Sequence, residues 1–111
     1  MKTLFKNYNY SFEKNDAKII STFCKQAIKQ MSTDERFSSD IKAYQSIISK
    51  IDTNAAEVKL TKDEKFRLVK QMEENVKHYQ KEIKHSWFIK KWLYKSMLKQ
   101  YNLILSKYFE D

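Results

Sequence analysis

The stretch TKDEKFRLVKQMEENVKHYQKEI, residues 61–83, combines a helix start signal with a long apolar stripe. It opens with Thr61 and Glu64 at the spacing of a capping box, in which each side chain accepts a hydrogen bond from the other residue's backbone amide. The pattern therefore predicts a helix that begins near Lys62. Apolar residues then recur at steps of three and four, as on the packed side of a helix: Val69, Met72, Val76, Tyr79 and Ile83.

The apolar stripe continues beyond this stretch, to Tyr108. One unbroken helix over residues 62–109 would be about 70 Å long. Half of its stripe would then need a second chain, which would give a homodimer. The chain can instead turn near Ser86, with Ser86 as the N-cap of a fourth helix that folds back. We expect the four-helix form, and the alternative is three helices with one very long C-terminal helix that dimerises.

The N-terminal residues 1–11 are expected to form an extended arm. Aromatic and polar residues alternate there with a period of two, which is typical of extended backbone. The only other stretch with this period is Val58–Leu60, so it is the one segment with which Tyr8–Tyr10 can pair. We expect no larger sheet.

Two helices are predicted between the arm and residue 61. The first is capped by Ser11 or Asn15 and continues to about Met31, with apolar residues spaced at three and four. The stretch Ser32–Glu35 has the form of another capping box, so the second helix is expected to begin near Thr33. It runs through two serines to end at Asp52–Thr53–Asn54, with an apolar stripe formed by Phe37, Ile41, Tyr44, Ile48 and Ile51.

Composition agrees with a helical chain. The 111 residues include no glycine and no proline. Glycine-rich phosphate-binding loops and tight glycine turns are therefore excluded, and with them nucleotide-binding motifs and multi-strand barrels. The fold class is all-α, a small four-helix bundle with an extended N-terminal arm, in a single helical domain over residues 1–111.

The net charge of +8 is concentrated in one segment. Residues 77–99 contain seven lysines and one acid, Glu82. Only Arg36 and Arg67 are arginines in the whole chain. Lysine attracts anionic surfaces as a point charge, whereas arginine supplies the planar fork that reads bases. The sequence predicts contact with a phosphate backbone rather than recognition of a base sequence.

Helical spacing places lysines and aromatic residues of this segment on one side. Cations for phosphates and aromatic rings for stacking on bases are the residue types that a nucleic-acid surface needs. In a competing interpretation the arm (Phe5, Tyr8 and Tyr10) covers the two aromatic residues, and an anionic membrane or an acidic protein is a further possible partner. The candidate residues for binding an anionic partner are Lys84, Phe88, Lys91, Trp92, Lys95 and Lys99.

No catalytic or metal-binding constellation is evident. Cys24 lies on an apolar helix face and is expected to be a buried small hydrophobe. Glu82 and His85 have a Glu-x-x-His spacing, but the chain lacks the second copy that a di-iron site needs. We expect a non-enzymatic binding protein without a cofactor, with RNA or DNA as the first candidate partner. A protein–protein adaptor or inhibitor that uses the apolar stripe for self-association or for a partner helix is the alternative.

The remaining expectation concerns location. The first seven residues contain no apolar run long enough for a signal peptide, and no stretch approaches the roughly 20 apolar residues that span a bilayer. We therefore expect a cytoplasmic protein with no transmembrane segment.

Overall fold

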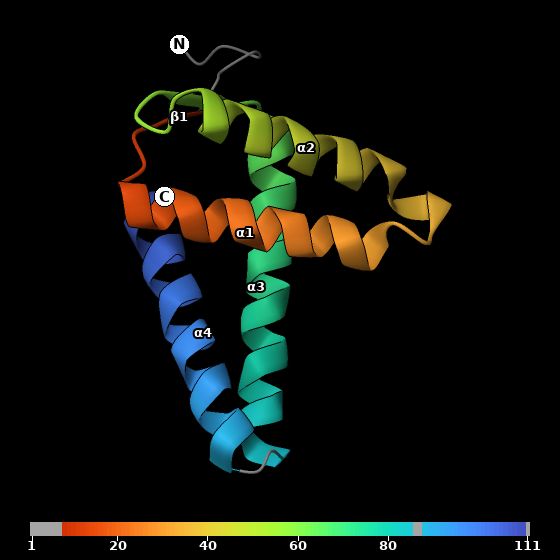
Figure 1. Cartoon of the computed structure of the whole chain (residues 1–111), viewed down its shortest axis with the longest axis vertical. Coiled ribbons are helices and arrows are strands. Elements are labelled where there is room, and N and C mark those ends of the chain that lie inside the picture. The colour runs from red at the N-terminus through yellow and green to blue at the C-terminus, as the bar shows by residue number, and fades with distance from the viewer. Residues whose placement is uncertain (1–7, 86–87, 111) are drawn as a thin grey trace. The chain divides into compact units, whose positions relative to one another are not determined.

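The structure is a computed structural model that describes residues 8–85 and 88–110, without the side chains of residues 85, 88 and 89. It forms two compact units, Met1–Leu68 and Val69–Asp111, and each is described by itself. The elements in chain order are β1 (Tyr8–Tyr10), α1 (Lys14–Met31), the 3-10 helix η1 (Glu35–Phe37), α2 (Ser38–Thr53), β2 (Val58–Leu60), α3 (Lys62–His85) and α4 (Phe88–Tyr108) (Figure 1).

The all-α fold class and its four helices are confirmed. Because α3 ends at His85 and α4 begins at Phe88, the alternative of one continuous helix over residues 62–109 is wrong. Ser86, the predicted N-cap of the fourth helix, lies outside the described residues. The single domain over residues 1–111 stays a prediction.

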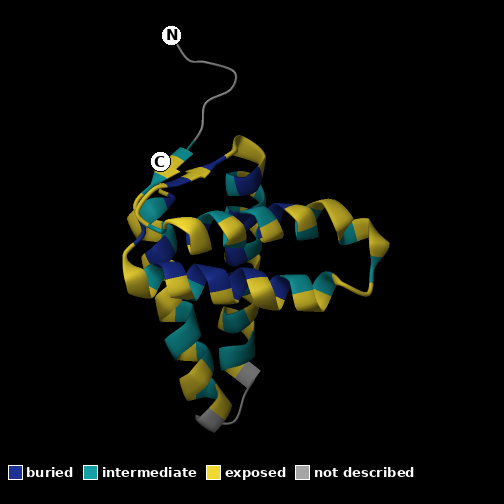
Figure 2. Cartoon of the chain, turned by 45° about the horizontal axis from the view of Figure 1, so that its top comes forward, coloured by how far each residue is buried: buried dark blue, intermediate teal, exposed yellow. Residues whose placement is uncertain are grey.

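In the first unit, α1 and α2 lie side by side and bury the sides that face each other (Figure 1, Figure 2). Tyr44 packs in this core, and its hydroxyl donates a hydrogen bond of 3.2 Å to the backbone carbonyl of Arg67. The first turns of α3 therefore close the same core. Its fully buried members are Ile20, Phe23, Cys24, Tyr44, Ile47, Val58, Leu60 and Leu68.

The two short strands form an antiparallel pair. Tyr8 faces Leu60 and Tyr10 faces Val58, which confirms the pairing predicted for the two stretches with a period of two. Val58 and Leu60 are buried while Lys59 between them is exposed, so the alternation reflects a strand with one packed side.

The start of the second helix was predicted wrongly. Ser32 does not cap α2, because its hydroxyl donates instead to the carbonyl of Lys29 at the end of α1, at 3.0 Å. Asp34 caps the short helix η1 by accepting a hydrogen bond from the backbone amide of Arg36, and its carboxylate also pairs with the Arg36 guanidinium at 2.7 Å. This local turn takes the place of the capping box, and α2 begins at Ser38.

Two further details differ from the expectation. Neither Ser11 nor Asn15 is the N-cap of α1, since Glu13 occupies that position. The amide of Phe12 donates to the carbonyl of Ala55 at 2.9 Å, which holds the chain just before the helix starts.

The packed side of α2 is broader than the predicted stripe. Ala43 and Ile47 are buried although neither belongs to the stripe, whereas Phe37, Ile41 and Ile48 are half-buried. The helix packs against both α1 and the first turns of α3. The predicted stripe assumed a single packed side and therefore includes too few of the buried positions.

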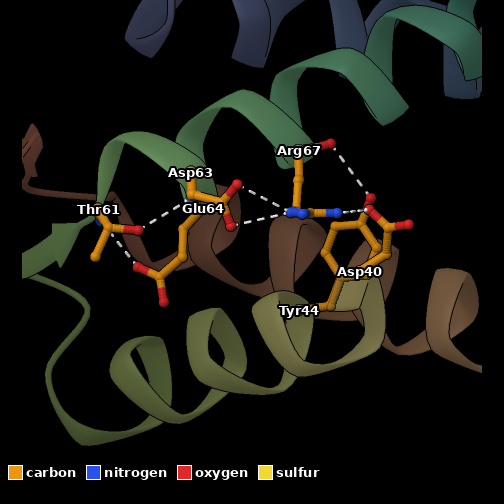
Figure 3. Close-up of polar contacts among 6 residues, drawn as sticks. All are labelled: Asp40, Tyr44, Thr61, Asp63, Glu64 and Arg67. Atoms are coloured by element: carbon orange, nitrogen blue, oxygen red, sulfur yellow. Dashed lines mark hydrogen bonds and ion pairs between the residues drawn. The ribbon is translucent and has the colours of Figure 1, made fainter. Parts of the chain in front are cut away.

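The capping box at the start of α3 is confirmed (Figure 3). The amide of Thr61 donates to Glu64 Oε1 at 2.9 Å, and the amide of Glu64 donates to Thr61 Oγ1 at 3.1 Å. Glu64 is 7% exposed and forms an ion pair of 2.6 Å with Lys50 of α2. One turn later, Arg67 pairs with both Asp40 of α2 and Asp63 of its own helix.

Glu64→Gln is expected to lower the free energy of unfolding by about 1–3 kcal/mol at neutral pH, because the change weakens charged hydrogen bonds at a buried site. Burial alone raises the pKa of Glu64, but hydrogen bonds from Lys50, Ser46 and the Thr61 amide outweigh it and hold the pKa below its ordinary value. The stabilisation is therefore present above the ordinary carboxyl pKa and is lost as the pH falls through the lowered one.

Urea unfolding of both proteins between about pH 7 and about pH 3 checks this prediction, and the difference in stability should shrink toward acid pH. The exposed Glu57 offers a matched control. Glu57→Gln should change stability by less than about 0.5 kcal/mol. Parallel pH profiles for wild type and Glu64→Gln would contradict the account.

In the second unit, α4 folds back along the part of α3 that follows Leu68 (Figure 1). Three tyrosines join the two helices. The ring of Tyr79 lies 5.4 Å from that of Tyr94 and 6.0 Å from that of Tyr101. The apolar stripes of the two helices thus pack on each other within one chain. Burial raises the pKa of Tyr79, and raises that of Tyr101 to about 12, so both hydroxyls stay protonated at neutral pH.

Candidate nucleic-acid interface

The side of α4 turned away from its tyrosines carries lysines and one large aromatic residue. Tyr94 and Tyr101 mark the packed side of the helix, because their rings contact Tyr79. Trp92 exposes 74% of its surface. Lys95 and Lys99, which follow it by three and seven residues, are also exposed. These steps return to one side of an α-helix. The three side chains therefore share the outward side of α4.

The structure describes five of the six predicted site residues in full. Lys91, Trp92, Lys95 and Lys99 lie on α4, where Lys91 is half-buried at the edge of the outward side. Lys84 is exposed near the end of α3, so a different helix presents it. Phe88 is the first residue of α4, and its side chain lies outside the described residues.

The covering of Phe88 and Trp92 by the N-terminal arm stays a prediction, because residues 1–7 and the side chain of Phe88 lie outside the described residues. Trp92 is the most exposed large apolar residue described. Tyr10 stacks on Phe12, with ring centroids 5.4 Å apart, and Lys65 Nζ lies 4.5 Å above the ring of Tyr8. Phe5, the third arm residue, lies outside the described residues.

Leu103 extends this outward side and was missed from the sequence. It is 59% exposed and stands eleven residues, three helical turns, after Trp92. The predicted stripe over Tyr101, Leu105 and Tyr108 leaves Leu103 out, and its helical spacing from Trp92 could have placed it with the candidate site. Because Tyr101 and Ile104 take the buried positions, Leu103 is left with the lysines.

The lysines of residues 77–99 can interact with an anionic ligand. Within residues 8–85 and 88–110, no acidic side chain forms an ion pair with any of them. All except Lys91 are exposed. Both arginines, in contrast, form ion pairs in the first unit, Arg36 with Asp34 and Arg67 with Asp40 and Asp63. The basic surface is therefore made of lysine alone.

The described residues offer no metal centre, since no group of three or more His, Cys, Asp or Glu side chains could hold an ion. Cys24 is fully buried, as predicted, and burial raises the pKa of its thiol to about 12. The thiol is therefore neutral at physiological pH, whereas a nucleophile must be a thiolate. None of the described helices is both long and apolar enough to cross a bilayer.

Comparison with protein-family models, with curated proteins and with solved structures gives no match to this chain. Its function is therefore inferred from the geometry and chemistry of its own surface.

Proposed function

We propose that this chain is a non-enzymatic cytoplasmic protein that contacts RNA or DNA through the Lys/aromatic segment 77–99. One observation carries the proposal: Trp92 is 74% exposed on the same side of α4 as Lys95 and Lys99. An exposed indole among unpaired cations costs solubility unless a partner covers it. A nucleic acid supplies both kinds of partner, bases for the ring and phosphates for the lysines.

The chemistry of the cations supports backbone contact without base-sequence recognition. Base edges are read most often by arginine or by paired amide groups. Arg36 and Arg67 are engaged in ion pairs of the first unit, at 2.7 and 2.6 Å. Lysines on their long flexible stems instead follow a phosphate chain as point charges. The expected ligand is a nucleic acid bound in a salt-dependent way with little sequence preference.

The alternative function, an adaptor or inhibitor that uses the apolar stripe, has less support. The stripe positions Tyr79, Tyr94 and Tyr101 contact one another inside the chain. A partner helix or a second copy would have to replace these contacts. The outward side of α4 needs no such rearrangement to bind a ligand.

The test is a salt titration of binding to a labelled oligothymidylate and to a duplex of equal length. Log affinity should fall linearly with log salt, by about 0.7 per phosphate contact for the single strand. Changing Lys91, Lys95 and Lys99 together to Gln should flatten this slope by about two. The stability of the protein should change little, since Lys95 and Lys99 are exposed and Lys91 is only half-buried.

A matched control makes the same change of charge elsewhere. Lys42, Lys59 and Lys62 are exposed lysines of the first unit. Their joint change to Gln should leave the salt slope nearer to that of wild type than the α4 variant does. A folded α4 variant with unchanged affinity and slope would overturn the proposal.

A further inference from the structure

A groove in the first unit has a basic wall that the proposed nucleic-acid surface does not use. Its volume is about 650 Å³, and it lies between α1 and the end of α2 with the loop after it. Lys14, Lys18 and Lys25 line it from α1, at steps of four and seven. These steps place the three lysines along one side of the helix over about 16 Å.

The three lysines are available for a ligand. All are exposed, and none forms an ion pair with any residue that the structure describes. Between them, Ser21 and Thr22 also line the groove and add hydroxyl donors. Among the described lining residues the one acid is Asp52, which belongs to α2 and can accept from amide groups of a ligand. The basic wall is thus complementary to carboxylates or phosphates.

The floor of the groove favours an acidic peptide over a nucleic acid. Ala17, Ile51 and Ala55 supply small or aliphatic surface. The aromatic residue of the lining, Phe12, is buried and stacks on Tyr10, so its ring is not open to a nucleic-acid base. A floor of this kind accepts an aliphatic side chain. Unlike the outward side of α4, the groove lacks an exposed ring for base stacking.

We propose that this groove binds an acidic peptide segment of a partner protein, with an aliphatic side chain on the floor and carboxylates on Lys14, Lys18 and Lys25. An extended peptide of about five residues spans the length of the lysine row. The groove volume is within the usual range of ligand sites, about 300–1,000 Å³. This site is independent of the nucleic-acid surface, because it shares no residue with it.

The experiment selects peptides of about ten residues from a random display library on the whole 111-residue chain. This peptide length leaves room for residues flanking the bound five. The expected peptides combine Asp or Glu with Leu, Ile or Val. Changing Lys14, Lys18 and Lys25 together to Gln should weaken the best peptide about tenfold or more. The triple Gln variant of Lys42, Lys59 and Lys62 is the matched control and should retain affinity within about twofold.

A second variant tests the groove without removing a lysine. Ala56 is exposed and lines the groove, so Ala56→Glu places a carboxylate at the groove without burying it. It should weaken the acidic peptide as well. Both variants should keep the circular dichroism spectrum and melting temperature of wild type.

Four results would overturn the peptide proposal. Selection could yield no peptide that depends on the groove, or peptides without acidic residues. The Lys14, Lys18 and Lys25 variant could lower affinity for the oligothymidylate instead, which would assign the groove to a phosphate backbone. Light scattering could reveal a dimer that this variant separates, which would make a second copy the occupant. None of these results bears on the α4 lysine variant, which tests the nucleic-acid surface separately.

Discussion

Phe23→Ala should lower the free energy of unfolding by about 3–5 kcal/mol, which is the usual cost of removing a buried aromatic side chain from a packed core. Phe23 is 2% exposed at the centre of α1. Its truncation removes apolar contacts and leaves a cavity among neighbours that cannot collapse fully. Urea denaturation followed by circular dichroism measures the loss.

Phe66 provides the same chemical change at the surface. It is 62% exposed on α3, within the same unit. Phe66→Ala should therefore alter stability by less than about 1 kcal/mol. If the two substitutions proved equally costly, the assignment of the core to the facing sides of α1 and α2 would be wrong.

Trp92→Ala is expected to weaken binding of single-stranded oligothymidylate by about 1–3 kcal/mol, the usual value of one base stacked on an aromatic side chain. This corresponds to roughly a 5- to 150-fold loss of affinity. The free energy of unfolding should change by about 0.5 kcal/mol or less, because the indole is 74% exposed. Fluorescence anisotropy and thermal melting of the same variant measure the two quantities.

Two comparisons sharpen this result. Trp92→Phe keeps a ring for stacking and should recover part of the lost affinity. Duplex DNA has few unstacked bases, so Trp92→Ala should affect it less than the single strand. A large loss of stability with unchanged affinity would show that Trp92 packs within the protein, and the stacking role would then be abandoned.

Of the two capping boxes predicted from the sequence, one forms in the structure and the other does not. At Thr61 and Glu64 the box forms as expected, and the buried contact with Lys50 adds support from another helix. At Ser32 and Glu35 the same spacing fails. There Asp34 forms a shorter-range turn with Arg36, and Ser32 bonds backward to α1. A capping motif competes with every other local hydrogen bond that its residues can make.

The candidate interface was predicted in part. Helical spacing alone was sufficient to group Trp92 with Lys95 and Lys99, because the period of a helix is fixed by backbone geometry. It could not decide whether that group faced solvent or the N-terminal arm. The same spacing also places Leu103 with this group, but the prediction considered only the segment 77–99. Exposure depends on which neighbouring segments pack against a helix.

Sequence patterns were sufficient to predict the all-α class, the end of α1 at Met31, the start of α3 and the pairing of Tyr8–Tyr10 with Val58–Leu60. The first three follow from local backbone chemistry: the absence of glycine and proline, caps, and hydrophobic period. The strand pairing was predicted by elimination, because Val58–Leu60 is the only other stretch with a period of two.

The sequence favoured separate helices over one continuous helix, and the fold excludes the continuous form. The burial of Ile47 and the groove bordered by Lys14, Lys18 and Lys25 follow from the folded structure alone. These features depend on contacts between segments that are distant in the chain. A local sequence pattern does not determine the free energies of such contacts.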